Sequence, residues 1–127
     1  MKRLERKICK ATPLNRVRGE VWNVSFDPSV GAEMKKLRPA VVISDPSVGK
    51  LPLRIIVPIT DWNARYNGFP WFVELQMTLQ NGLAKHSGAD AFQVKSVSLD
   101  RFKSKRGKLL DSQLDDIASA IAICIGL

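Results

Sequence analysis

Alternating and β-branched apolar residues recur in short runs along most of the chain, and turn residues separate the runs. This spacing predicts strands, because every second side chain of a strand points to the same face. The predicted strands cover 21–26, 40–44, 53–59, 71–77 and 91–99. Pro58 indicates an edge position or a bulge in the third strand, and the irregular alternation at 96–98 indicates a bulge in the last.

A different spacing begins near the C-terminus and predicts a helix. Asp111 is a good N-cap, and aspartates follow where the helix dipole favours them. The apolar face comprises Leu114, Ile117, Ile121, Cys124 and Ile125. We therefore predict a fold that is mainly β with helices, in which a small, strongly bent antiparallel sheet or barrel is completed by a C-terminal helix.

The domain organisation is simple. Residues 1–17 are basic and lack periodicity, which predicts a loose arm or a short surface helix, and residues 18–127 form one domain. A basic cluster follows the last predicted strand over 101–108. No stretch has the length of a signal-peptide core or a membrane span, so we expect a soluble cytoplasmic protein.

The net charge indicates which classes of partner the protein binds, and the two cysteines indicate its redox state. There are 20 Lys and Arg against 12 Asp and Glu, for a formal net charge of +8. Such a surface attracts polyanions, which makes nucleic acid the first expectation, an acidic protein the second and an anionic membrane the third. Cys9 and Cys124 are expected to be reduced thiols rather than a disulfide.

Several kinds of chemistry are missing from the sequence. A single histidine, His86, excludes a two-histidine ribonuclease site within one subunit. Zinc-ligand spacing, a phosphate-binding glycine motif and the serine-hydrolase elbow are absent, and carboxylates do not recur in the pattern of a two-metal nuclease. We therefore predict no metal and no cofactor.

The remaining polar candidates lie on strands or at strand ends: Arg38, Thr60, His86, Gln93, Lys95 and Ser98. Such a set on a basic protein can stabilise a phosphorane without a metal, because RNA supplies its own nucleophile in the 2′-hydroxyl. An arginine fork suits the extra negative charge, and positioned acid–base groups suit the proton transfers.

Three blocks near the start resemble the MazF/PemK (Kid-like) toxin family of type II toxin–antitoxin systems. They are Arg-Gly-Glu-Val-Trp at 18–22, Phe-Asp-Pro-Ser-Val-Gly-Ala-Glu at 26–33 and Leu-Arg-Pro-Ala-Val-Val-Ile at 37–43. Weaker similarities follow at 57–60, 82–87 and 91–98. The resemblance covers about residues 16 to 127, and its first block is the most specific.

The resemblance implies an SH3-like barrel and a homodimer that binds single-stranded RNA along its interface. It further implies metal-independent, sequence-specific cleavage to 2′,3′-cyclic phosphate and 5′-hydroxyl ends. Arg38 matches the catalytic arginine of the family, and Thr60 matches the threonine beside it. Lys95 stands where family members often carry arginine. The lysine keeps the positive charge of the arginine but lacks its bidentate fork.

Expected partners and contacts follow from the same resemblance. The RNA-binding candidates are Lys35, Lys36, Trp62, His86, Gln93, Lys95 and Ser98. We expect a small acidic antitoxin whose disordered tail lies across the basic groove and competes with RNA. Two alternatives stay open: a non-cleaving toxin of the same fold, such as a topoisomerase inhibitor, and a catalytically inactive nucleic-acid-binding module.

Overall fold

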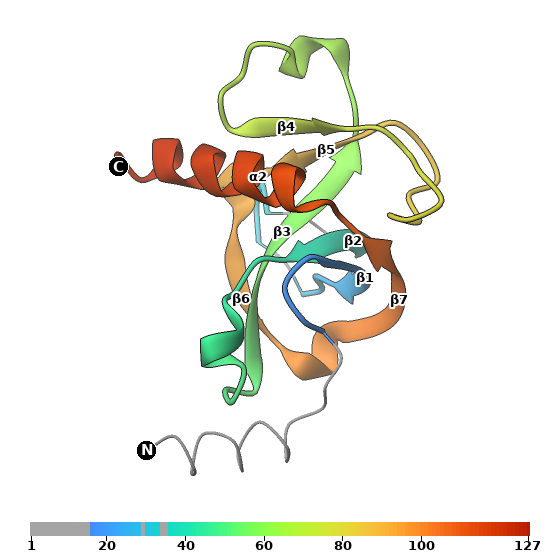
Figure 1. Cartoon of the computed structure of the whole chain (residues 1–127), viewed down its shortest axis with the longest axis vertical. Coiled ribbons are helices and arrows are strands. Elements are labelled where there is room, and N and C mark those ends of the chain that lie inside the picture. Colours follow the sequence, from blue (N-terminus) through green and yellow to red (C-terminus); the bar gives the residue numbers. More distant parts are fainter. Residues whose placement is uncertain (1–15, 29, 34–35) are drawn as a thin grey trace.

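The described residues form one antiparallel sheet, and the long helix α2 (Asp111–Cys124) crosses it (Figure 1). The computed structural model describes residues 16–28, 30–33 and 36–127. The strands are β1 Glu20–Ser25, β2 Leu37–Val42, β3 Leu53–Asp61, β4 Phe72–Leu75, β5 Ser87–Asp90, β6 Lys95–Ser98 and β7 Phe102–Lys108. The α-helix is α2, Asp111–Cys124, and the 3₁₀ turns are η1 Pro46–Val48, η2 Ala64–Tyr66, η3 Ala91–Gln93 and η4 Leu99–Arg101. Most of the predicted N-terminal arm, with Cys9, and Lys35 lie outside the described residues.

Strand β3 is the centre of the sheet rather than its edge. The strand order is β4-β5-β3-β2-β1-β7, and β6 also pairs with β3. Along one side of β3, β6 pairs with its first half and β5 with its end. Pro58 falls between these two partners, so its missing N–H leaves no ladder hydrogen bond unmade. The predicted edge position of Pro58 is therefore wrong.

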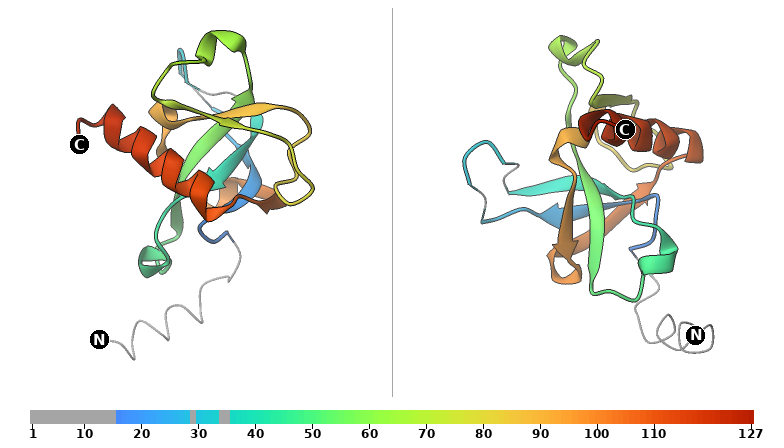
Figure 2. Two further views of the ribbon diagram at one scale, coloured as in Figure 1. Left: turned by 45° about the horizontal axis from the view of Figure 1, so that its top comes forward. Right: turned by 90° about the vertical axis from the view of Figure 1, so that its left-hand side faces the viewer.

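The sheet has two apolar faces, and each has its own core. One face packs beneath α2, where Val57 and Ile59 of β3 meet Leu114 and Ile117 of the helix. The other face curls around a second cluster that includes Trp22, Phe26 and Phe102, with Ile56 from β3. Residues of β3 alternate between the two cores because successive strand side chains point to opposite faces. Figure 2 shows α2 lying across one face only, while the β3–β4 loop projects beyond the sheet.

The fold class is confirmed as mainly antiparallel β with one C-terminal helix. Hydrogen-bonded neighbours run β6-β3-β2-β1-β7, and η4 connects β6 to β7 along the chain. A pairing of β6 with β7 would close this path into a barrel, and the strand pairings of the described residues do not include it. Closure of the barrel stays a prediction.

The predicted strand over 91–99 is wrong in its bounds. The Asp90 side chain accepts a hydrogen bond from the Phe92 backbone N–H and caps η3, which divides the segment into β5 and β6. The register of β6 with β3 is continuous, so the bulge predicted at 96–98 is wrong too. The turn at η3 is what shifts the alternation.

The basic segment 102–108 is a strand that the periodicity did not predict. Its lysines are exposed on β7, which forms one end of the sheet, and exposed lysines are typical of edge strands. The predicted helix is confirmed, with Leu110 rather than Asp111 at the N-cap. Leu114 and Ile117 are buried as expected, but Ile125 is 64% exposed. Within the described residues, no helix has the length and apolar character needed to cross a membrane.

Candidate functional site

Arg38 and Thr60 are brought together by the register of β2 and β3. The two strands are antiparallel, with Ala40 opposite Pro58. Continuing this register by two residues places Arg38 opposite Thr60, on the same face of the sheet. The pair lies where β2 begins and β3 ends, so both side chains are only partly buried. The structure thus unites the two residues that the sequence indicated for catalysis.

The guanidinium of Arg38 has unused hydrogen-bonding capacity. Its Nε atom is buried and has no hydrogen-bond partner among the described residues. A buried donor without a partner costs free energy, so such groups in native proteins call for an explanation. Arginine matches the geometry of phosphate, so an oxyanion bound by the fork of the guanidinium would satisfy this donor once the side chain turns toward solvent.

The row that begins with Arg38 and Thr60 continues across the sheet. Thr60 lies opposite Gly88 of β5, and Gly88 lies opposite Glu74 of β4. Trp62 follows Thr60 by two positions, and its ring covers Gly88, where an added Cβ would lie 2.9 Å from the ring atom Cε3. The glycine therefore allows an aromatic ring to lie flat against the sheet beside Thr60.

His86 and Glu74 form a polar pair beside that ring. The Nε2 atom of His86 lies 2.6 Å from Oε2 of Glu74, and the imidazole stacks on Trp62 with the ring centroids 5.7 Å apart. Both side chains are accessible, with exposed fractions of 40% for His86 and 46% for Glu74. Gln76 lies within 3.4 Å of the same imidazole nitrogen. The cluster presents an aromatic surface, a carboxylate and an imidazole to solvent on the face that carries Thr60.

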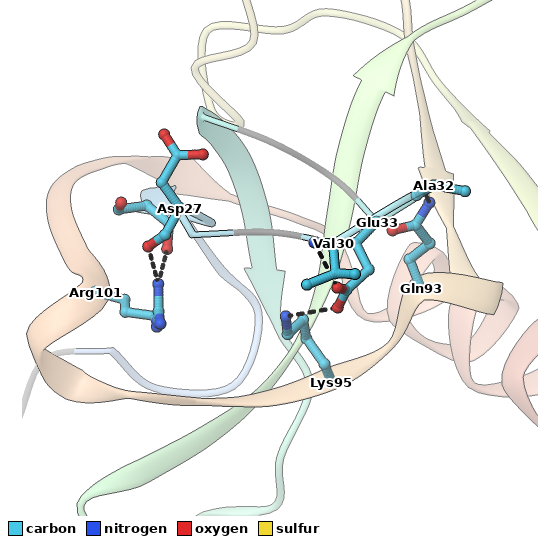
Figure 3. A network of polar contacts seen from close by, with 8 residues as sticks. Asp27, Val30, Ala32, Glu33, Gln93, Lys95 and Arg101 are labelled. Carbon is cyan, nitrogen blue, oxygen red and sulfur yellow. Dashed lines mark hydrogen bonds and ion pairs between the residues drawn. The ribbon is translucent and has the colours of Figure 1, made fainter.

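Lys95 and Gln93 lie against the loop between β1 and β2 (Figure 3). The Lys95 ammonium is 3.9 Å from a carboxylate oxygen of Glu33, and Gln93 donates from Nε2 to the backbone carbonyl of Ala32 at 3.4 Å. Lys95 lies opposite Ile56 in β3, on the face that carries Thr60. Lys36 is exposed at the end of this loop. Lys36 and Lys95 thus place two positive charges at this loop, one of them near the carboxylate of Glu33.

Arg101 fixes the first part of the same loop. Its guanidinium donates to the backbone carbonyls of Ser25 and Asp27, at 3.1 and 2.6 Å. Asp27 in turn accepts a hydrogen bond from the backbone N–H of Lys36, so both ends of the loop are held. Arg101, from the basic cluster 101–108, therefore holds the loop between β1 and β2 in place.

Ser98 is a predicted site residue that the fold places far from the Arg38–Thr60 pair. It lies opposite Leu53, seven residues before Thr60 along β3, which corresponds to about 23 Å in an extended strand. Its hydroxyl accepts a hydrogen bond from the backbone N–H of Asp100 and caps η4.

Two carboxyl groups beneath the surface have shifted pKa values. Burial raises the pKa of Asp90, and hydrogen bonds from the Phe92 and Gln93 backbone offset this only in part. Burial also acts to raise the pKa of Glu20, but hydrogen bonds from Lys105, Trp22 and Val17 outweigh it and lower the pKa. Within the described ranges, no three His, Cys, Asp or Glu side chains converge in a way that could hold a metal ion.

Glu74 and Gln76 were not among the residues predicted from the sequence. Both occupy polar positions of the alternating run 71–77, where they read as the solvated side of a strand. Their position near His86 depends on β4 pairing with β5, which sets Glu74 opposite Gly88 and beside His86. In the sequence, the single carboxylate of this run, Glu74, is the only signal that could have indicated the cluster.

Together, the fold and the site define a class: a small basic β-sheet protein, one face of which carries an arginine whose Nε has no hydrogen-bond partner among the described residues, a threonine and an aromatic–carboxylate cluster. Residues 17–125 match the family described as PemK-like, MazF-like toxin of type II toxin–antitoxin system. The chain belongs to this family.

Individual relatives agree with that membership. The chain is 30% identical over 116 residues to endoribonuclease MazF9 of Mycobacterium tuberculosis, covering 87% of this chain and 96% of the relative. It is 27% identical over 110 residues to endoribonuclease MazF of Staphylococcus saprophyticus, covering 87% and 91%. A crystal structure of MazF (Form-I) from Deinococcus radiodurans superposes with a TM-score of 0.73 at 22% identity, over 91% of this chain and 98% of the other. A mycobacterial endoribonuclease in complex with its cognate antitoxin gives 0.69 at 16% identity, over 87% and 95%.

Proposed function

We propose that this chain is a metal-independent, sequence-specific endoribonuclease toxin that cuts single-stranded RNA to 2′,3′-cyclic phosphate and 5′-hydroxyl ends. The observation that carries the proposal is the juxtaposition of Arg38 with Thr60, in which Nε of Arg38 is buried without a partner among the described residues. Relatives named endoribonuclease support the same activity.

The proposed reaction uses the RNA's own nucleophile. The 2′-hydroxyl loses its proton and attacks the adjacent phosphorus, the bond from phosphorus to the 5′-oxygen breaks, and that oxygen takes up a proton. Arg38 stabilises the extra negative charge on the phosphorane, and Thr60 donates a hydrogen bond that orients the phosphate. Lys36, Lys95 and Gln93 contact the RNA on one side of the cut.

The proposed assembly is a homodimer with RNA bound along its interface. The last turn of α2 and the residues after it expose Ile123, Ile125 and Leu127, an apolar group that a second subunit can cover. The proposed antitoxin is a small acidic protein whose disordered tail lies across the basic face, as the net charge of +8 favours. Relatives include MazE–MazF complexes from Deinococcus radiodurans.

The deciding experiment is cleavage of a long, mixed-sequence RNA in EDTA by the purified protein and by Arg38→Ala, with the new ends identified by mass. The wild type should give discrete fragments with cyclic-phosphate ends. Arg38→Ala should cut about 10²–10³-fold more slowly, the loss typical of one donor to a developing oxyanion. Lys50→Ala is the charge-matched control, because it removes one exposed positive charge from the loop between η1 and β3.

Two results would contradict the proposal. Intact RNA after incubation with a folded wild-type dimer would favour a non-cleaving toxin or binding module, and a DNA-supercoiling assay would follow. An equal loss of activity in Arg38→Ala and Lys50→Ala would show that only overall charge matters. The antitoxin proposal fails separately if bound antitoxin leaves RNA cleavage unchanged.

A further inference from the structure

We propose that Trp62, His86 and Glu74 form a nucleobase subsite that selects a guanine at, or one nucleotide from, the cleaved bond. This inference rests on the proposed function, because it assigns a specificity pocket to the same RNA site. Its starting point is the row of residues across β2, β3, β5 and β4, in which Glu74 lies two strands from Thr60. Two strand spacings amount to about 10 Å, a distance that the sugar and base of one nucleotide can bridge.

The aromatic part of the subsite is held in place before RNA binds. Trp62 packs on Gly88, and its ring contacts leave no room for a Cβ at that position. The backbone N–H of Trp62 donates to the carbonyl of His86 at 3.0 Å, and Tyr66 meets the indole edge-on with the centroids 5.8 Å apart. A ring fixed in this way loses little entropy when it stacks against an unpaired base.

The polar part of the subsite offers a carboxylate that is only half used. His86 engages one lone pair of Oε2 of Glu74, so Oε2 can accept a second hydrogen bond, and Oε1 has no partner among the described residues. An ionised carboxylate accepts hydrogen bonds and donates none. Guanine is the base that presents two adjacent donors on its Watson–Crick edge, N1–H and the N2 amino group, and unstacked RNA bases are commonly read on that edge.

The other bases fit this carboxylate less well. Adenine and cytosine each pair one amino donor with a ring-nitrogen acceptor, and uracil offers one N–H between two carbonyl acceptors. Each would place an acceptor lone pair against a carboxylate oxygen or leave that oxygen unpaired. A good bidentate contact discriminates between bases by a factor of about 5 to 150.

The test compares short RNAs that differ only at the selected position. The ends produced from a long mixed-sequence RNA first locate the cut motif, which should contain a guanine at a fixed place. Three oligonucleotides with guanine, inosine or adenine there are then cleaved by the wild type. Inosine lacks the N2 amino group, so the rates should fall in the order guanine, inosine, adenine, spanning about 10- to 100-fold.

Glu74→Gln should compress this order to within about threefold, because an amide offers one acceptor and one donor where guanine needs two acceptors, and it can pair with adenine instead. Asp61→Asn is the matched control, since Asp61 is also an exposed carboxylate at the end of β3, paired with Lys85 at 3.2 Å, and it points away from the face that carries Thr60. This control should keep the full guanine preference.

Three outcomes would overturn the subsite: a cut motif without guanine, an unchanged base order in Glu74→Gln, or an equal loss on all three oligonucleotides. The last would assign Glu74 to the chemical step or to the fold. If the wild type cuts no RNA at all, the proposed function fails, and binding of the wild type to short uridine oligonucleotides that carry a single guanine, inosine or adenine then tests the subsite alone. Equal affinities for the three would refute it.

Discussion

Replacing Glu20 by glutamine should destabilise the protein, because this buried carboxylate joins β1 to β7. Its side chain is 9% exposed, and Oε2 lies 2.8 Å from the Lys105 ammonium. Its Oε1 accepts hydrogen bonds from the backbone N–H of Val17 and from Nε1 of Trp22, both at 3.0 Å. Lys105 lies opposite Trp22 in β7, so the contacts form one closed group.

The expected loss is about 2–3 kcal/mol at pH 7, from hydrogen bonds to a charged group at roughly 1.5–3 kcal/mol each. Glutamine keeps one acceptor oxygen, which can still serve Val17 and Trp22. The amide NH₂ of the glutamine then points toward the Lys105 ammonium, and no hydrogen bond forms because both groups are donors. The substitution therefore removes the charge-assisted contact and leaves the remaining two hydrogen bonds weaker.

The destabilisation should depend on pH in a definite direction. The folded protein holds the pKa of Glu20 below its ordinary value of 4.5, so the ionised carboxylate contributes stability above that pH. The contribution is lost as the pH falls through the lower, folded-state pKa. The difference between wild type and Glu20→Gln should thus be constant from pH 7 to about 5.5 and narrow below 4.5.

Urea denaturation followed by tryptophan fluorescence, at one fixed protein concentration, measures this difference. Asp61→Asn provides the control, because its ion pair with Lys85 is exposed on both sides and should contribute less than about 1 kcal/mol. A loss below about 0.5 kcal/mol at pH 7, or the same loss at pH 3.5 as at pH 7, would refute the reasoning.

Two further substitutions test the structure elsewhere. Asp90→Asn should stabilise the protein at pH 7, because burial raises the pKa of Asp90 above its ordinary 3.8. The wild type loses stability as the pH rises through this raised pKa and Asp90 ionises, whereas the neutral asparagine does not. Melting temperatures of the two proteins should therefore converge below pH 3.8. A lower melting temperature for Asp90→Asn at pH 7 would contradict this. Gly82→Ala should cost at least about 2 kcal/mol, since Gly82 has a φ of +65° and an added Cβ would lie 2.0 Å from the Arg106 carbonyl oxygen. Gly31→Ala is the control, because Gly31 also has a positive φ but nothing lies within 4 Å of the added Cβ. If urea denaturation shows the same loss of stability for Gly31→Ala as for Gly82→Ala, the clash with the Arg106 carbonyl is not the cause.

Prediction from the sequence succeeded where the pattern is local. The β-branched runs at 40–44 and 53–59 are strands at the centre of the sheet, and the helical spacing of Leu114 and Ile117 buries both residues beneath α2. It failed where charge concealed a strand, as in β7, and where one side chain divided a run, as Asp90 does at η3. In both cases the deciding interaction lies outside the alternation of apolar residues.

The candidate site divides in the same way. Arg38 and Thr60 could be named from their motifs, and the net charge of +8 indicated a polyanionic partner, because residue type and near neighbours are properties of the sequence itself. That Arg38 faces Thr60, that Ser98 lies at the far end of β3, and that Glu74 joins His86 beside Trp62 were decided only by the tertiary structure. The physical reason is strand register, because a shift of one residue reverses which face of the sheet a side chain occupies. The register of β3 is set by its pairing with β2, β5 and β6, which are separate segments of the sequence.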